Sequence, residues 1–139
     1  MVVLTAILLA CATDQTTKTG VPNDRLSPCP ASPNCVSSLS EDTSRQVEPL
    51  TYTLTLEEAR EKLISVINSM KRSEIVSADY NYIHATFTSF LFRFVDDVEF
   101  SFDDAKKVID VRSASRTGYS DLGVNRRRVE EIRKRFMAQ

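Results

Sequence analysis

The spacing of hydrophobic positions changes along the second half of the chain, and it first has the period of a helix. Thr55 and Glu58 have the spacing of a capping box, in which the Thr hydroxyl and the Glu carboxylate each accept a backbone N–H at a helix start. The apolar residues that follow recur three or four positions apart, which predicts a helix with one buried face lying on a sheet. These residues are Ala59, Leu63, Val66, Ile67 and Met70.

From residue 73 the period becomes two, and β-branched and aromatic residues predominate. In one segment Val98, Phe100 and Phe102 alternate with polar residues, which is typical of a strand with one face on the core and one in water. Residues 103–106 have the composition of a turn, so the strands on either side are expected to form a hairpin. The predicted strands cover residues 74–78, 82–94, 97–102 and 107–113.

A second helical pattern occupies the C-terminal end of the chain. Asn125 is predicted to cap this helix, with Val129, Ile132 and Phe136 facing inward. The order helix, several strands, helix is typical of an α+β fold. We therefore predict a single domain over residues 26–139, in which an antiparallel sheet of about four or five strands has two helices packed on one face.

The N-terminal segment has the pattern of a bacterial lipoprotein signal. Residues 1–10 form an apolar run far shorter than the about 20 residues that span a bilayer, and Leu8-Leu9-Ala10-Cys11 resembles a lipobox. We predict a signal peptide cleaved before Cys11, lipidation of Cys11, and a flexible tether over residues 11–25. The alternative is a frayed strand with Cys11 as an ordinary buried thiol. Ala12 stands where inner-membrane lipoproteins carry a retention aspartate, so the outer membrane, facing the periplasm, is the expected location.

The other two cysteines, Cys29 and Cys35, form an even pair suited to an oxidising compartment. Prolines surround them, and all five prolines of the chain lie before residue 50. We predict a small disulfide-bridged loop, which in the chain-entropy model contributes only about 2 kcal/mol and so orders a coil segment without creating the fold. Metal ligation lacks partners, because the chain has one histidine and no further cysteine pair. Neither a metal nor a cofactor is expected.

Charge is nearly balanced overall, with a net charge of −1, but it is unevenly spread. Residues 111–139 carry 8 basic and 3 acidic side chains. A basic block can indicate nucleic-acid binding, yet an exported protein rarely meets nucleic acid, and helical arginines more often form a solvated face. No nucleic-acid partner is therefore expected.

Three sequence blocks carry a resemblance to a known family. They are Ser32–Ser38, Phe92–Phe100 and the long block Val111–Arg128, and they occur in order within residues 26–137. The chain resembles the bacterial and plant family called domain of unknown function 1499. The resemblance implies a small exported or thylakoid-associated protein, often lipid-anchored, and it implies no particular activity.

The third block also has an unusual composition for a link between a strand and a helix. Its arginines lie near Asp121 and several hydroxyls, including those of Tyr119 and Ser120, and Gly118 and Gly123 indicate a loop of defined shape. Asp96 and Asp97 are the expected acidic partners of Arg112 and Arg116, and strand alternation predicts that one of the two aspartates points away from solvent. The candidate binding residues are Asp96, Asp97, Arg112, Ser113, Ser115, Arg116, Asp121, Asn125 and Arg126.

Three interpretations of these residues remain open. They can form a structural Asp–Arg–Ser network that pins the loop to the sheet. They can bind an anion such as a carboxylate or phosphate through guanidinium groups and the backbone N–H groups near Asn125. They can also form an enzyme site, with Asp96 or Asp97 as general base and Ser113 or Ser115 as nucleophile.

The remaining candidate chemistry favours structural roles. His84 shares a strand face with polar residues, so we expect a half-exposed strand residue and not the base of a catalytic triad. The phenylalanines are expected to form core and strand pairs rather than a cofactor pocket. They are Phe87, Phe90, Phe92, Phe94, Phe100 and Phe102.

Together these patterns favour an envelope lipoprotein held to the membrane by its lipid anchor. We expect a non-enzymatic binding or assembly module whose partner is a small anionic ligand or an envelope protein. The alternative is a small hydrolase-like enzyme that uses the Asp96/Asp97 and Arg112/Arg116 cluster.

Overall fold

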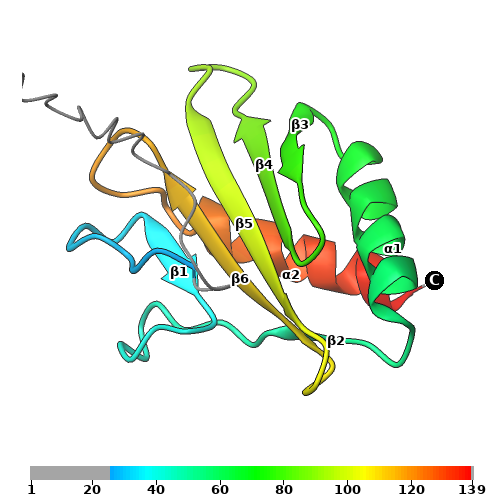
Figure 1. The fold of residues 1–139 in the computed structure, drawn as a ribbon. Coiled ribbons are helices and arrows are strands. Elements are labelled where there is room, and N and C mark those ends of the chain that lie inside the picture. Colours follow the sequence, from blue (N-terminus) through cyan, green and yellow to red (C-terminus); the bar gives the residue numbers. More distant parts are fainter. Residues whose placement is uncertain (1–25, 139) are drawn as a thin grey trace, which may run out of the picture.

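The computed structural model describes residues 26–138, which share one hydrophobic core (Figure 1). The predicted signal peptide, the lipidated Cys11 and the tether lie outside the described residues. Among residues 26–138, no helix combines the length and the apolar character needed to cross a membrane.

The predicted α+β class is confirmed, with one six-stranded sheet and two helices on one face of it (Figure 1). The strand order is β1-β6-β5-β4-β3, β2 also pairs with β6, and every strand pair is antiparallel. The sheet exceeds the expected four or five strands because the proline-rich N-terminal part adds β1 and β2. The elements are β1 (Cys35–Ser37), β2 (Leu50–Thr51), α1 (Leu56–Asn68), β3 (Ser73–Ala78), β4 (Tyr82–Thr88), β5 (Val95–Asp103), β6 (Val108–Ser115) and α2 (Val124–Met137).

Helix α1 starts at the predicted capping box. The Thr55 hydroxyl accepts from the Glu58 backbone N–H at 3.2 Å, and the Glu58 carboxylate accepts from the Thr55 backbone N–H at 2.9 Å. Leu63, Val66 and Ile67 are fully buried against the sheet, as their spacing predicts. Satisfied N–H groups at the first turn and one apolar face together account for this helix.

Strand β4 is shorter than predicted, because the chain reverses after Thr88. The Ser89 backbone N–H donates to the Phe94 carbonyl at 2.8 Å, and the Phe94 backbone N–H donates to the Ser89 hydroxyl at 2.9 Å. These bonds close a hairpin loop in the middle of the predicted strand. Phe87, Phe100 and Phe102 are buried as expected, but the expectation of core and strand pairs is wrong for Phe90, Phe92 and Phe94, which are exposed and lie outside the strands.

Helix α2 buries Val129, Ile132 and Phe136 as predicted, but the prediction that Asn125 caps it is wrong. The helix begins at Val124, and its N-cap is Gly123, whose φ of 79° suits a residue without a side chain. The Asp121 carboxylate accepts the backbone N–H groups of Gly123 and Asn125 at 2.8 and 3.0 Å. Asp121 therefore takes the capping role, and Asn125 lies in the first turn with its side chain fully buried.

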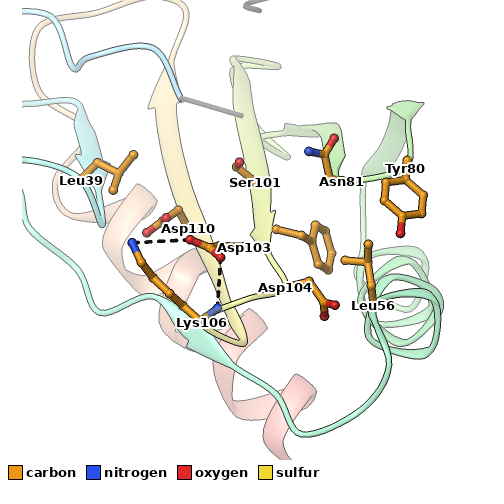
Figure 2. A pocket seen from close by; sticks show the side chains of 10 residues that line it. Leu39, Leu56, Tyr80, Asn81, Ser101, Asp103, Asp104, Lys106 and Asp110 are labelled. Atoms are coloured by element: carbon orange, nitrogen blue, oxygen red, sulfur yellow. Dashed lines mark hydrogen bonds and ion pairs between the residues drawn. The ribbon is translucent and has the colours of Figure 1, made fainter. Parts of the chain in front are cut away.

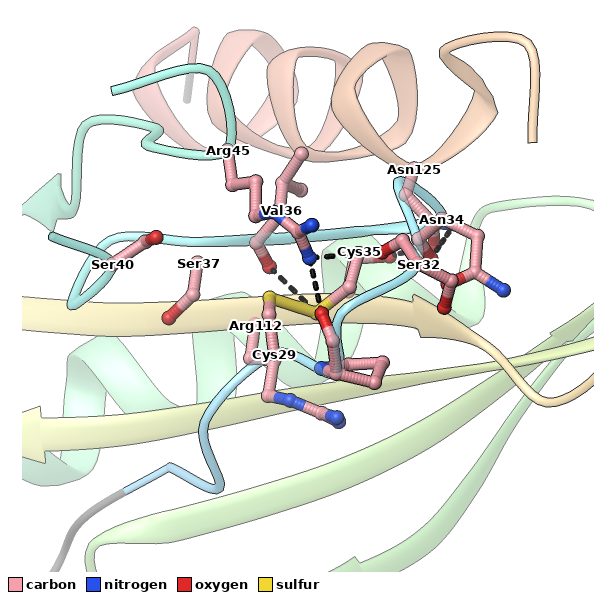
Figure 3. The surroundings of a disulfide bond; sticks show 12 residues. Cys29, Ser32, Asn34, Cys35, Val36, Ser37, Ser40, Arg45, Arg112 and Asn125 are labelled. Atoms are coloured by element: carbon pink, nitrogen blue, oxygen red, sulfur yellow. Dashed lines mark hydrogen bonds between the residues drawn. A yellow bond between two sulfur atoms is a disulfide. The ribbon is translucent and has the colours of Figure 1, made fainter. Parts of the chain in front are cut away.

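The predicted disulfide joins Cys29 to Cys35, with 5.6 Å between the two Cα atoms. It ties the segment before β1 to the open face of the sheet, the face without helices (Figure 3). Cys35 pairs with Ala114 and Ser37 pairs with Arg112, so the bridge lies beside the end of β6.

Candidate functional site

The candidate residues divide between the two faces of the sheet. Asp96 is only 5% exposed and faces the helices, whereas the neighbouring Asp97 side chain is 24% exposed on the open face. Because successive strand residues point to opposite faces, the prediction that one aspartate turns away from solvent is confirmed. The same alternation sends Ser113 toward the helices and Arg112 to the open face.

On the helix side, the Asn125 side chain is the centre of a buried polar network. Its amide nitrogen donates to the Asn34 carbonyl at 3.1 Å, the Ser115 hydroxyl at 2.9 Å and the Asp121 carboxylate at 2.8 Å. Its amide oxygen accepts from the Ser113 hydroxyl at 2.6 Å and from Arg128 at 2.9 Å. We call these residues, together with Asp96, the Asn125 cluster. The donors and acceptors of the central amide are all in use.

Arg112 or Arg116 was expected to pair with Asp96. Its partner in the structure is instead Arg128. Arg128 Nη2 lies 2.6 Å from the Asp96 carboxylate, and both side chains are nearly buried. The Arg128 guanidinium also stacks over the Phe87 ring, 4.9 Å from its centroid. Helical spacing could have identified Arg128, because it lies one turn after Asn125 and next to Val129 on the inward side of α2.

Asp121 joins the cluster to the first turn of α2. Burial by itself would raise the pKa of Asp121, but hydrogen bonds from the Asn125 side chain and backbone and from Gly123 outweigh it and lower the pKa. The carboxylate therefore stays charged at the positive end of the helix, where a negative charge is favourable.

The Asn125 cluster brings all three family-like sequence blocks together. Asn34 comes from the first block, Asp96 from the second, and Ser113, Ser115 and Asn125 from the third. The Asn34 side chain also donates to the Gly118 carbonyl at 2.7 Å, which fixes the loop before α2. The segments that carry the resemblance therefore meet in one structural network.

On the open face, Asp97 accepts two hydrogen bonds from Arg116, through Nε and Nη2, both at 2.8 Å. His84 Nε2 lies 2.7 Å from the same carboxylate, so His84 is the half-buried strand residue that its position predicted. The hydrogen bond from Arg116 is the main reason that the pKa of Asp97 lies below its usual value. Asp97 is consequently held in its charged form.

A second ion pair lies on the open face, where Glu99, two residues after Asp97 on β5, meets Arg112. Arg112 Nη1 donates to Glu99 Oε2 at 2.9 Å, and the Tyr82 hydroxyl donates to the other carboxylate oxygen, Glu99 Oε1, at 2.6 Å. Burial, together with this hydrogen bond to Glu99, raises the pKa of Tyr82. Arg112 is among the residues around the disulfide (Figure 3), and its Nε is buried without a partner among the described residues. Tyr82 and Glu99 were not among the sequence candidates, although both lie on the polar side of alternating strands.

Arg126 takes no part in either group. Its guanidinium donates to the Gln46 carbonyl at 2.9 Å and to the Ser44 carbonyl at 2.8 Å, so it pins the segment before β2 to α2. With Asp121 and Gly123 it borders a small pocket of about 260 Å³. The nine candidate residues therefore form no single pocket.

A pocket of about 720 Å³ among residues 26–138 lies at the other end of the sheet, and sequence reasoning missed it (Figure 2). It is bordered by the β3–β4 turn with Tyr80 and Asn81 and by the β5–β6 hairpin with Asp103 and Asp104. Asp110 of β6 contributes a third carboxylate. We call these five residues and their pocket the acidic groove. Asp103 and Asp104 are adjacent in the sequence, but only strand pairing brings them close to Tyr80.

The carboxylates of the groove are only partly neutralised. Asp103 lies 3.5 Å from Lys106, a lysine with a well-exposed side chain. Figure 2 marks this ion pair with a dashed line. Asp104 accepts from Lys107 at 2.7 Å, and this hydrogen bond is the main cause of its lowered pKa. Asp110 accepts from the Ser38 hydroxyl at 2.8 Å. Among residues 26–138, no group of three or more His, Cys, Asp or Glu side chains has the arrangement of a metal site.

Comparison with curated proteins and with solved structures finds no match for this chain. A protein family, by contrast, matches over most of the chain. It is described as "Protein of unknown function (DUF1499)", and it covers all three blocks, helix α1 and all but the last residue of α2. The chain therefore belongs to the DUF1499 family, which it matches over residues 25–136.

Proposed function

We propose that the protein is a lipid-anchored lipoprotein of the cell envelope and that it acts as a binding or assembly module, not as an enzyme. The observation that carries the non-enzymatic part is the closure of the Asn125 cluster. The Asn125 amide is fully buried, the side chains around it are buried or partly buried, and the amide has no remaining hydrogen-bonding capacity for a substrate. Such a network favours the structural interpretation of the third sequence block.

The hydrolase-like alternative is weakened by the placement of its parts. Asp97 lies beside His84, but Arg116 occupies both of its oxygens and lowers its pKa, which makes it a poor general base. Of the two serines considered as nucleophiles, Ser113 is fully buried on the opposite face of the sheet, and the hydroxyl of the partly buried Ser115 accepts from the Asn125 amide at 2.9 Å. Such a hydrolysis needs a nucleophile and a base within hydrogen-bond reach of each other.

The envelope location rests on the N-terminal sequence. The Leu8-Leu9-Ala10-Cys11 segment resembles a lipobox, and the Cys29–Cys35 disulfide suits an oxidising compartment such as the periplasm. Stable attachment needs more than one acyl chain, which a triacylated cysteine supplies. Ala12 favours the outer membrane in a cell that has one.

The ligand surface of the module is the acidic groove. An anionic ligand at the open face would have to compete with Asp97 and Glu99 for their arginines, which counts against the expected anion site. Three carboxylates, Tyr80 and Asn81 line the groove, where Asp103 is paired with the exposed Lys106. This arrangement favours a ligand or a partner segment that carries amino groups, which would replace Lys106 beside Asp103.

Membrane fractionation of the full chain in a Gram-negative host tests the anchor. We expect the wild-type protein in the outer-membrane pellet and Cys11→Ser in the soluble periplasmic fraction. A Cys29→Ser variant serves as the control, because it removes a cysteine without touching the lipobox. If Cys11→Ser stays in the pellet like wild type, the lipoprotein assignment is wrong.

A thermal-shift titration tests the groove, with spermidine as the cationic probe and citrate as the anionic one. Spermidine should raise the melting temperature of the wild-type chain by mass action, and Asp103→Asn/Asp110→Asn should remove the effect. Glu130→Gln, an exposed carboxylate on α2, should respond like wild type. A shift with citrate alone would instead favour the anion-binding interpretation, and equal shifts in all variants would reject the groove.

A further inference from the structure

The β4–β5 loop displays a group of apolar side chains to solvent. Phe90, Leu91, Phe92 and Phe94 are each between 51% and 75% exposed, although they are nearly consecutive in the sequence. Exposed apolar residues on a soluble domain are usually scattered singly, and a contiguous group indicates a contact surface. We call residues 90–94 the aromatic tip.

The aromatic tip has a defined shape. The bonds between Ser89 and Phe94 close the loop at its base, and the Phe92 and Phe94 rings stack with their centroids 5.6 Å apart. Figure 1 shows the loop projecting beyond the end of the sheet, at the upper end of β4 and β5. The apolar side chains are therefore carried on a projection, and they line neither the acidic groove nor the small pocket beside Arg126.

A second loop adds apolar surface at the same end of the sheet. The β6–α2 connection leaves β6 beside the start of β5, where the Arg116 backbone N–H donates to the Val95 carbonyl at 3.0 Å. Tyr119 and Leu122 on this loop are both strongly exposed. Both loops at this end of the sheet therefore expose apolar side chains.

The charge around the aromatic tip is positive. Arg93 lies within it, and Arg72 covers the Phe90 ring with its guanidinium 5.6 Å from the ring centroid. Lys71 precedes Arg72, and residues 69–73 and 86–95 contain no acidic side chain. The opposite end of the sheet carries the three carboxylates of the acidic groove.

Aromatic rings and basic side chains together fit one kind of surface best. Phenylalanine and leucine enter the boundary between headgroups and acyl chains, while arginine and lysine stay at the level of anionic headgroups. We propose that the aromatic tip inserts into the interface of an anionic phospholipid bilayer, which gives the domain a direct membrane contact separate from its lipid anchor. A projecting tip needs no complementary groove to enter a fluid bilayer.

This contact goes beyond the proposed function and orients the anchored domain. The 15 residues of the tether, residues 11–25, span at most about 50 Å, so an anchored domain stays within reach of the same membrane. Tip insertion holds the acidic groove at the far end of the strands, facing the compartment and not the lipid. The groove then stays open to its ligand.

The chain contains no tryptophan, which permits a local test of the tip. Phe92→Trp in the full chain places a single reporter in the tip, and Tyr80→Trp, at a position 78% exposed at the opposite end, is the matched control. Both proteins are mixed with vesicles of phosphatidylglycerol and phosphatidylethanolamine. The F92W emission should shift to shorter wavelength and be quenched by lipids with brominated acyl chains, whereas the Y80W emission should keep its solvent-exposed wavelength.

Charge reversal tests the electrostatic part of the proposal. Arg93→Glu in the F92W chain should weaken vesicle binding on the order of tenfold, and Lys106→Glu, at the far end, should leave it unchanged. Neutral phosphatidylcholine vesicles should give a smaller shift of the F92W emission than the anionic vesicles do.

Three results would overturn the proposal. The F92W emission could stay unshifted, whether or not the protein sediments with the vesicles. The two reporters could shift equally. The F92W emission could shift without lipid and increasingly with protein concentration, which would identify a second copy of the chain as the occupant. Because the readout is local to the tip, none of these results bears on Cys11, whose anchoring is measured separately by fractionation of Cys11→Ser.

Discussion

Two adjacent aspartates of β5 show how one sheet can use the same chemistry in two ways. Asp96 pairs with Arg128 between the sheet and α2, where both side chains are nearly buried. Asp97 pairs with Arg116 on the open face, where the arginine is half-exposed. Removing one partner of a buried pair leaves an uncompensated charge, whereas water and ions can replace the partner of an exposed pair. Burial, more than bond geometry, should therefore decide what each arginine contributes.

The largest effect is expected from Arg128→Ala. The loss of Arg128 leaves the Asp96 carboxylate buried without its counter-charge, which should lower the free energy of unfolding by about 3–5 kcal/mol. Urea unfolding of the full chain measures it. Arg127 is the exposed residue just before Arg128. The free energy of unfolding of Arg127→Ala should stay within about 0.5 kcal/mol of wild type.

If Arg128→Ala is too unstable to purify, Asp96→Asn/Arg128→Met should recover part of the loss, because it removes both charges together. Equal unfolding curves for Arg128→Ala and Arg127→Ala would show that Asp96 is solvated and would erase the contrast between the two aspartates.

A smaller loss is expected from Asn125→Asp, which keeps the size of the side chain. The new carboxylate would replace the amide that donates to Asp121 at 2.8 Å and to Ser115 at 2.9 Å. Lost donors and repulsion from Asp121 should cost about 2–4 kcal/mol near neutral pH. The cost should shrink as the pH falls, because a protonated carboxyl group can donate again.

Urea unfolding between pH 4 and pH 8 measures this dependence. Asn68→Asp, at the exposed end of α1, should change stability little and without the same pH dependence. An Asn125→Asp protein that loses the same stability at every pH would place the damage in packing and not in the charge of the cluster.

The smallest effect is expected from Arg116→Ala on the open face. Arg116 lowers the pKa of Asp97, so the stability it supplies is present above the unfolded-state pKa of about 3.9 and is lost as the pH falls through the folded-state value. The variant should be slightly less stable than wild type at pH 7 and equal to it at about pH 2.

Urea unfolding at these two pH values, repeated in 1 M salt, measures the contribution of Arg116. High salt should reduce the difference at pH 7, because the pair is accessible to ions. A loss as large as that of Arg128→Ala would mean that the open face is covered in the native protein.

Local features of this fold follow from the sequence. The start of α1 is set by Thr55 and Glu58, three residues apart, and the β5–β6 hairpin by alternation around a short turn. The Cys29–Cys35 bridge likewise joins residues six positions apart. Each depends on groups that the chain holds close together whatever the rest of the molecule does.

Alternation predicted which residues face the core more accurately than it predicted where each strand ends. Phe87 has the parity of Ile83 and Ala85 and is buried with them, whereas Phe90, Phe92 and Phe94 have the parity of the polar residues. The sequence thus held a sign that these three rings lie outside the core. The reversal at Ser89 was missed because it contains no glycine or proline, and a side-chain hydroxyl supplies one of its closing bonds.

The sequence by itself determined the fold class and the faces of the strands, because periodicity and composition are properties of neighbouring residues. Only the tertiary structure decided which arginine meets which aspartate and what Asn125 does. Arg128 reaches Asp96 across 32 positions, and Asn125 reaches Asn34 across 91. The acidic groove also needs Tyr80 and Asp110 from separate strands. Strand register and helix placement set these distances, and they depend on how the whole core packs, which no local pattern encodes.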